Sequence, residues 1–153
     1  MDESKAVELY HRYRPKRLRD VVGQQASVTA LEEMLKRNRV PRTLLFCGGS
    51  GVGKTTLARI LRRKLGCGDQ DFQEINAASE RGIDVIRDIE YRMGLAPIAG
   101  ECRVWLLDEV HQLTRRKGGD AQTALLKVLE DVPHHVYFFL CTTDPGQLLK
   151  TIR

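Results

Sequence analysis

Long hydrophobic runs and paired cysteines are both missing from this sequence of 153 residues. No window approaches the roughly 18 consecutive apolar residues that indicate a membrane-spanning helix. The first residues, MDESKAVELYHRYR, lack the apolar core of a signal peptide. The four cysteines, Cys47, Cys67, Cys102 and Cys141, stand far apart without a CxxC pair, which argues against a disulfide framework and against a zinc site. We therefore expect a soluble, cytoplasmic protein that does not contact a membrane.

Acidic residues are missing from one long stretch of the chain. The whole sequence has 25 Lys and Arg against 20 Asp and Glu, a formal net charge of +5. Between Glu33 and Asp69, however, there is no acid at all. Such a block produces a positive field suited to nucleotide phosphates or nucleic acid. Charge alone slightly favours the alternative, a solvated helix face. The basic residues of the block are Lys36, Arg37, Arg39, Arg42, Lys54, Arg59, Arg62, Arg63 and Lys64.

The pattern of apolar residues predicts one α/β domain over residues 1–153. A composition of 42% hydrophobic and 29% charged residues is typical of a globular protein. Short apolar runs, which predict strands, alternate with segments of helical spacing. This alternation indicates βαβ units and a mostly parallel sheet. The predicted strands are 43–47, 73–77, 104–107 and 136–141, and the predicted helices are 24–38, 57–65, 84–93 and 121–131.

A glycine-rich segment follows the first predicted strand. Residues 48–55 read GGSGVGKT and match the P-loop pattern GxxxxGK[ST] at every fixed position. Glycines let the backbone curl so that its N–H groups face phosphate oxygens, and the next helix adds its positive end. Lys54 is expected to reach the β- and γ-phosphates, and the Thr55 hydroxyl to bind Mg²⁺. The predicted nucleotide-binding residues here are Gly48, Gly49, Ser50, Gly51, Val52, Gly53, Lys54, Thr55 and Thr56.

Two carboxylates follow the third predicted strand. A carboxylate at the end of a buried strand is costly unless a cation or hydrogen bonds meet it. Beside a P-loop, Asp108 is therefore expected to hold Mg²⁺, with a strand-end cap as the alternative. Glu109 is placed to polarise a water for attack on the γ-phosphate, which favours ATP hydrolysis, and a plain surface acid is its alternative. His111 is expected to lie beside this Mg²⁺ site.

Further segments accompany these motifs in a fixed order. They read YRPK at 13–16, DVVGQ at 20–24, NAASERGID at 76–84, DEVH at 108–111, QTALLK at 122–127 and TTDP at 142–145. Together with the P-loop they resemble the AAA+ clamp-loader ATPases, the family of the bacterial DNA polymerase III gamma/tau subunits and the replication factor C small subunits. The resemblance covers about residues 10–153. Six linked motifs are far more specific than a lone P-loop.

The resemblance implies a fold and further site residues. The fold is a P-loop NTPase (AAA+) of three α/β/α layers with strand order 1-4-3-2, the family's fifth strand being missing. Thr143 falls on the family's sensor position, with Thr142 as the neighbouring alternative. The adenine pocket would include Tyr13, Arg14, Pro15, Val21 and Val22. Candidate DNA contacts, against the alternative of ordinary surface residues, are Arg81, Gly82, Gln122 and Lys127.

The sequence also departs from the gamma/tau pattern. That type carries a four-cysteine zinc module after the P-loop helix, but here only Cys67 stands at a matching place, so we expect no zinc. The chain stops at Arg153, before the family's Ser-Arg-Cys arginine finger, fifth strand, lid and collar. We therefore expect a fragment that binds ATP but hydrolyses only traces of it. Without a fifth strand, residues 43–47 would form an open, aggregation-prone edge.

The P-loop and the carboxylates predict an ATPase module, and the resemblance implies that it belongs to a sliding-clamp loader, which couples Mg·ATP binding and hydrolysis to clamp opening and loading. Its expected partners are other subunits of a hetero- or homo-pentamer, the clamp and primer–template DNA. One alternative is a non-hydrolysing structural subunit of the same ring. Another is a different AAA+ DNA machine, such as a branch-migration motor or a helicase loader.

Overall fold

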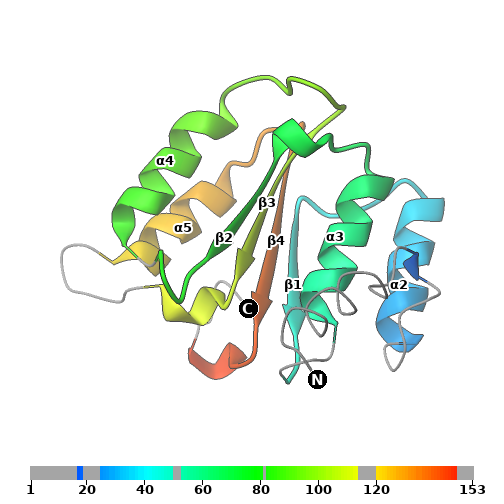
Figure 1. Ribbon diagram of the computed structural model, residues 1–153, viewed down its shortest axis with the longest axis horizontal. Helices are drawn as coiled ribbons and strands as arrows, with labels where there is room; N and C mark the ends of the chain where they lie inside the picture. The colour runs from blue at the N-terminus through cyan, green and yellow to red at the C-terminus, as the bar shows by residue number, and fades with distance from the viewer. Residues whose placement is uncertain (1–16, 19–24, 50–52, 81, 114–119, 148–153) are drawn as a thin grey trace, which may run out of the picture.

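A parallel sheet of four strands lies at the centre of the chain (Figure 1). The computed structural model describes residues 17–18, 25–49, 53–80, 82–113 and 120–147. The strand order is β1-β4-β3-β2, and all three pairings are parallel, as the sequence predicted. The strands are β1 (Thr43–Cys47), β2 (Phe72–Asn76), β3 (Arg103–Asp108) and β4 (Val136–Thr142).

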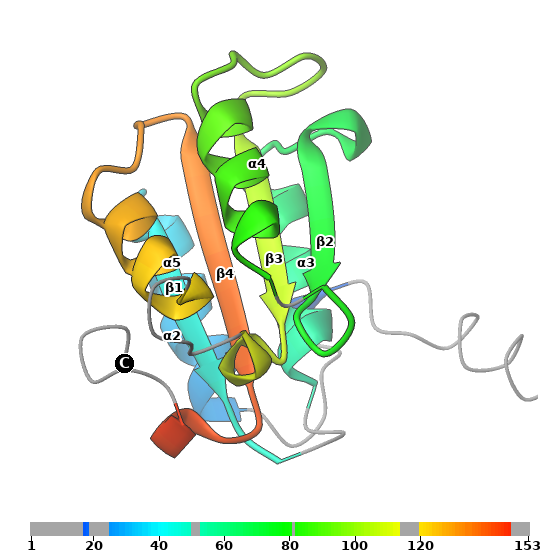
Figure 2. The ribbon, with the colours of Figure 1, turned by 90° about the vertical axis from the view of Figure 1, so that its left-hand side faces the viewer.

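Helices cover both faces of the sheet and complete three layers (Figures 1 and 2). One face carries α2 (Gln25–Lys36) and α3 (Lys54–Lys64), and the other carries α4 (Ile83–Met93) and α5 (Ala121–Glu130). Alternate side chains of β3 pack against the two helical layers. Leu106 belongs to the core on the α2–α3 face, and Leu107 belongs to the core on the α4–α5 face. Burial on both faces explains why β3 and β4 read as continuous apolar runs.

The strand β1 lies at an edge of the sheet. It pairs with β4 through Thr43↔Phe138 to Cys47↔Thr142, and no other described strand pairs with it. Its first four residues are half-buried and Cys47 is exposed, whereas the first five residues of β3 are buried. This edge is the one expected from the sequence.

Asp71 holds the connection between α4 and β3 against the end of α3. It lies in the short 3₁₀ helix η2 (Asp69–Asp71), and its carboxylate accepts the N–H groups of Ile98, Ala99 and Gly100 at 2.7, 2.8 and 2.9 Å. Although burial opposes ionisation, these hydrogen bonds and the nearby Arg103 guanidinium hold the pKa of Asp71 below its ordinary value. The connection packs so closely that a Cβ at Gly100 would clash with the Gly66 carbonyl oxygen.

Two further 3₁₀ turns follow the central strands and shape the loops at their carboxyl ends. They are η3 (Val110–Gln112) after β3 and η4 (Pro145–Gln147) after β4. Asp120 caps the start of α5, and its carboxylate accepts the N–H groups of Gln122 and Thr123 at 2.9 and 3.3 Å. Among the helices that the structure describes, none has the length and apolar character required to cross a bilayer.

Candidate nucleotide-binding site

Loops from three strands meet at one edge of the sheet. Because β1, β3 and β4 run parallel, the residues that follow them lie at the same edge. The N–H of Gly48, at the start of the P-loop, donates to the carbonyl oxygen of Thr142 at 3.3 Å. Ligands of open α/β sheets bind at this carboxyl edge. The fold therefore brings together the predicted P-loop, the two carboxylates at the end of β3 and the two threonines at the end of β4.

The described part of the P-loop has the backbone and cation that a phosphate site requires. Gly53, at the start of α3, has a φ of 85°, a left-handed conformation that glycine adopts without a steric penalty. The next residue, Lys54, is buried, and its Nζ donates to the carbonyl oxygen of Gly49 at 2.9 Å. The ammonium group thus lies against the loop itself. Thr56 follows on α3 and is half-buried.

Thr55 and Asp108 come together from opposite sides of the site. The Thr55 hydroxyl donates to Asp108 Oδ2 at 3.4 Å, and Asp108 Oδ1 accepts the N–H of Glu109 at 3.0 Å. A hydroxyl and a carboxylate are hard oxygen ligands, which suit Mg²⁺, an ion that usually takes its other ligands from water and phosphate. These two side chains therefore fit the metal expected from the sequence.

The described residues contain no group of three or more His, Cys, Asp or Glu side chains that could hold a metal ion. A magnesium ion here would thus depend on the nucleotide and on water for its remaining ligands. The expectation that the chain binds no zinc stays a prediction.

Glu109 has a strained backbone and a well-held side chain. Its φ of 51° and ψ of 45° lie in the left-handed region, which costs a residue with a Cβ roughly 1–2 kcal/mol. The turn aims its carboxylate toward the residue that follows β4, where Oε2 accepts the Thr143 hydroxyl at 3.0 Å. The same Oε2 lies 3.5 Å from His111 Nε2. The residue expected to polarise water is thus held by Thr143, which the resemblance places at the sensor position.

Two thiols flank the site. Burial raises the pKa of Cys141, on β4, to about 12, which keeps this thiol protonated at neutral pH. Cys47 ends β1 next to the P-loop and is exposed. Partial burial raises the pKa of Cys47, and the positive charge of Lys54 opposes this effect. Neither thiol has the lowered pKa of a reactive nucleophile.

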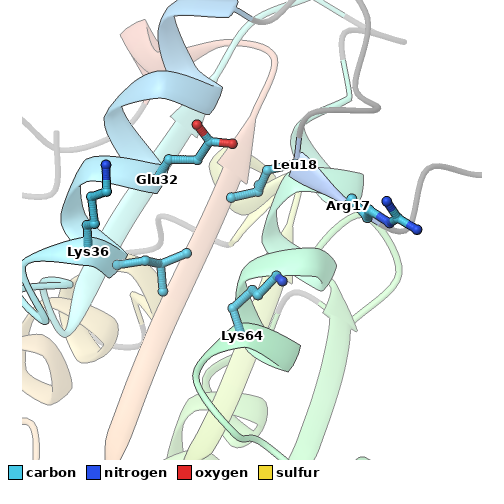
Figure 3. A pocket seen from close by; sticks show the side chains of 6 residues that line it. Arg17, Leu18, Glu32, Lys36 and Lys64 are labelled. Carbon is cyan, nitrogen blue, oxygen red and sulfur yellow. The ribbon is translucent and has the colours of Figure 1, made fainter.

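The hollow beside Lys54 is small and largely apolar. It has a volume of about 170 Å³ and lies between α2 and β1, with Ser27, Leu31, Phe46 and Lys54 among its lining residues. A larger hollow of about 470 Å³ lies elsewhere (Figure 3). Its lining residues are Arg17, Leu18, Glu32, Leu35, Lys36 and Lys64. Because Lys64 ends α3 whereas Lys54 begins it, this basic hollow is remote from the P-loop.

The acid-free block of the sequence does not form one surface. Lys54 enters the P-loop, Arg62 is buried and pairs with Asp69 at 2.8 Å, and Lys64 lines the remote hollow. Arg59 forms an ion pair with Glu74 on β2. The positive field at the phosphate site therefore comes mainly from one lysine and the start of α3.

The candidate DNA contacts separate into two groups. Gly82 is exposed immediately before α4, and Lys127 is exposed on α5. Gln122, by contrast, has no exposed surface, and its Nε2 donates to the carbonyl oxygens of His111 and Leu113 at 3.4 and 3.3 Å. The expectation that Gln122 contacts DNA is wrong, because its side chain is enclosed in the protein.

Several predicted site residues lie outside the described residues. They are Tyr13, Arg14, Pro15, Val21 and Val22 of the adenine pocket, Ser50, Gly51 and Val52 of the P-loop, and Arg81. One contact was missed by the sequence analysis, namely that between His111 and Thr142. His111 Nδ1 lies 2.8 Å from Thr142 Oγ1. A polar residue three positions after Asp108 was the available signal, but the strand order alone does not give the register between β3 and β4, which selects its partner.

Comparisons with known proteins agree with this geometry. The family model described as DNA polymerase III, delta subunit, matches residues 69–153, more than half of the chain. The chain is 38% identical to the DNA polymerase III subunit tau of Escherichia coli over an alignment of 165 positions, which covers 94% of this chain and 25% of that protein. The chain thus spans about a quarter of the length of this relative.

Solved structures share the fold. A variant of RuvB from Thermotoga maritima superimposes with a TM-score of 0.66 and 26% identity, covering 92% of this chain and 45% of that one. A DNA polymerase III gamma subunit-related protein from the same organism has a TM-score of 0.65 and 23% identity, covering 80% and 42%. The architecture is that of the AAA+ P-loop ATPases, as the sequence predicted.

Proposed function

We propose a function for this chain from the premise that it belongs to the DNA polymerase III delta-subunit family. Residues 1–153 form the nucleotide-binding module of a clamp-loader ATPase, which binds ATP with Mg²⁺ and couples its hydrolysis to the opening and loading of a sliding clamp. The observation that carries this proposal is the contact between the Thr55 hydroxyl and the Asp108 carboxylate beside Lys54. A P-loop NTPase needs these three groups together.

Each side chain of the site has a separate task in this proposal. Lys54 leaves the Gly49 carbonyl and binds the β- and γ-phosphates, while the free N–H groups at the start of α3 contact phosphate oxygens. Thr55 and Asp108 hold Mg²⁺, which when bound neutralises charge on the phosphates. Glu109 accepts a proton from the attacking water, and Thr143 orients the Glu109 carboxylate. The adenine pocket is assigned to Tyr13, Arg14, Pro15, Val21 and Val22.

The proposed partners follow from the same premise. They are the other subunits of a pentameric loader, a sliding clamp and primer–template DNA, in the cytoplasm. Gly82 and Lys127 remain candidate DNA contacts because both are exposed, and Arg81 is proposed with them. Backbone N–H groups at helix starts and lysine ammonium groups bind phosphates without reading the base sequence.

The proposed coupling is tested by measuring ATP hydrolysis in the presence of partners. The chain is assayed alone, with primer–template DNA, and with DNA together with a bacterial sliding clamp and the remaining loader subunits. Stimulation that requires both the clamp and the primed DNA is expected. Stimulation by unprimed duplex alone, with no response to the clamp, would contradict the clamp-loading proposal and leave the ATPase proposal standing.

A branch-migration motor is a second candidate, because RuvB variants superimpose over most of the chain and one RuvB structure is titled a Holliday junction branch migration motor. Sequence identity favours the clamp-loader proposal, since this chain is 38% identical to the tau subunit and 26% identical to the RuvB variant. ATP hydrolysis stimulated by a four-way DNA junction, and not by primed DNA with a clamp, would support the second candidate. A structural subunit that does not hydrolyse ATP is disfavoured by the retention of Lys54, Asp108 and Glu109.

A further inference from the structure

His111 connects the end of β4 with the acidic residue after β3. The imidazole is buried, with 8% of the residue exposed. Its Nδ1 lies 2.8 Å from the Thr142 hydroxyl oxygen, and its Nε2 lies 3.5 Å from Glu109 Oε2. No comparison and no motif in the sequence assigns a role to this bridge.

We propose that His111 is a positioning residue, which holds the Glu109 carboxylate through an imidazole proton on Nε2. This proposal rests on the ATPase function proposed above. His111 acts through Glu109 and does not itself contact the nucleotide. The tautomer follows from counting the protons at both ends of the ring.

At the first end, the Thr142 hydroxyl has one proton to donate. Its oxygen accepts the N–H of Asp144 at 3.1 Å, and the only other polar contact described for it is His111 Nδ1. Thr142 has no exposed surface, so water does not supply another acceptor. A buried hydroxyl that donates to Nδ1 leaves no proton on that nitrogen. The remaining ring proton then belongs on Nε2.

At the second end, this arrangement puts a positive N–H dipole beside a carboxylate. The opposite tautomer would direct the lone pair of Nε2 at Glu109 Oε2, which is electrostatically unfavourable. The Gln112 Nε2 atom lies 3.4 Å from the same ring nitrogen. Rotation of this exposed amide by about 180° replaces its nitrogen with oxygen, an acceptor that the Nε2–H can also use. Both ends of the ring therefore select the same proton position.

The surrounding contacts hold the His111 ring in place and determine which oxygen of Glu109 can meet a water molecule. Gln122 donates to the carbonyl oxygen of His111, which secures η3 against α5. With Thr143 and His111 both at Oε2, Glu109 Oε1 has no described partner and is the oxygen available to a water molecule. Thr142 also receives the Gly48 N–H on its carbonyl oxygen. One residue of β4 thus connects the P-loop with the ring that orients Glu109.

The first test observes the tautomer without any nucleotide. The 153-residue chain is labelled with nitrogen-15 histidine, and long-range proton–nitrogen correlations are recorded at a pH where the rings are neutral. The His111 signal is identified by its loss in His111→Gln. A protonated Nε2 with an unprotonated Nδ1 is expected. A protonated Nδ1, or rapid averaging between tautomers, would overturn the proposal.

The second test separates positioning from a purely structural role. An amide at this position can replace only one ring nitrogen: His111→Gln retains a donor near Nε2, and His111→Asn places its amide near Nδ1. We expect His111→Asn to slow single-turnover hydrolysis by about tenfold, and His111→Gln to restore the rate to within about threefold of wild type. The dissociation constant for ATP should stay within about threefold in both variants.

Equal rates in the two variants, or a parallel loss of ATP affinity, would show that His111 only supports the fold. His134→Asn is the matched control, since His134 is an exposed histidine outside the site. Absence of ATP binding by the wild-type chain would refute the proposed function. The tautomer measurement would still decide the positioning proposal, because it needs no nucleotide.

Discussion

The hydroxyl of Thr143 donates to Glu109 Oε2 across the gap between the ends of β4 and β3, at 3.0 Å. Glu109 adopts a left-handed backbone conformation that directs its carboxylate toward this hydroxyl. Strain of this kind at a residue next to a P-loop is typical of functional sites. The pair joins the proposed general base to the strand end where the family resemblance places a sensor.

Replacement of Thr143 should therefore impair catalysis more than binding. We expect Thr143→Val to lower the single-turnover rate of ATP hydrolysis by about 10–100-fold, part of the 10²–10⁴-fold that a positioned base contributes. ATP affinity should change by less than about threefold, because Thr143 is not one of the proposed phosphate ligands. Thr143→Ser, which keeps the hydroxyl, is the control and should retain most of the rate. A Val variant as fast as wild type would exclude Thr143 from the mechanism.

The Asp71 carboxylate should make a large contribution to stability. Its removal leaves three backbone N–H groups without their acceptor, each at a cost of about 1–3 kcal/mol if it stays buried. We expect Asp71→Ala to lower the free energy of unfolding by about 3 kcal/mol, measured by urea denaturation. Asp88→Ala is the control, because this half-exposed carboxylate makes only a surface ion pair with Arg92 and should cost about 0.5 kcal/mol. Similar losses in both variants would contradict the proposed role of Asp71.

The same carboxylate predicts a pH dependence of stability. The pKa of Asp71 is lower in the folded chain than in the unfolded chain, where an aspartate has a pKa of about 3.9. The folded state therefore binds protons less readily, and the contribution is complete above about pH 5 and declines as the pH falls through the lowered folded pKa. The stability difference between wild type and Asp71→Asn should shrink in acid. A difference that stays constant down to pH 2 would show that ionisation of Asp71 is not its source.

Thiol labelling should distinguish Cys47 from the other cysteines. Cys47 is exposed at the entrance to the P-loop, whereas Cys67, Cys102 and Cys141 are buried. We expect iodoacetamide to modify Cys47 first in the native chain. ATP with Mg²⁺ should slow this reaction severalfold, because a nucleotide bound at the P-loop shields the neighbouring thiol in the fraction of chains that are occupied. Mass spectrometry of digested samples gives the site, and labelling in guanidinium chloride gives the control for all four thiols. An unchanged Cys47 rate in saturating ATP would argue against a nucleotide at this loop.

The sequence predicted the sheet well because each strand is a local apolar run. Residues 43–47 were predicted and found as β1, and residues 136–141 differ from β4 by one residue. The strand order followed from the family resemblance, since local pattern does not determine which strands are neighbours. Gln122 was misplaced on the surface, although it precedes the buried Leu125 by three positions and helical spacing puts both on one face.

Contacts between distant residues could not be predicted in the same way. Asp71 reaches residues 98–100 because η2 places it beneath the connection that leaves α4. His111 meets Thr142 only because β3 and β4 are adjacent in the sheet. Such pairings depend on the assembled fold, and no spacing within one segment encodes them.

Nucleotide binding at the P-loop is tested by titrating the chain with a slowly hydrolysed ATP analogue in the presence of Mg²⁺ and measuring the heat of binding by isothermal calorimetry. We expect saturable binding of one nucleotide by the wild-type chain and a loss of at least about tenfold in affinity in Lys54→Ala, because a buried ammonium contributes a strong charge-assisted contact to phosphate. Lys64→Ala, at the other end of α3 and exposed, should bind like wild type. Absence of binding by the wild-type chain, or equal affinity in Lys54→Ala and wild type, would show that Lys54 and its loop do not form a nucleotide site.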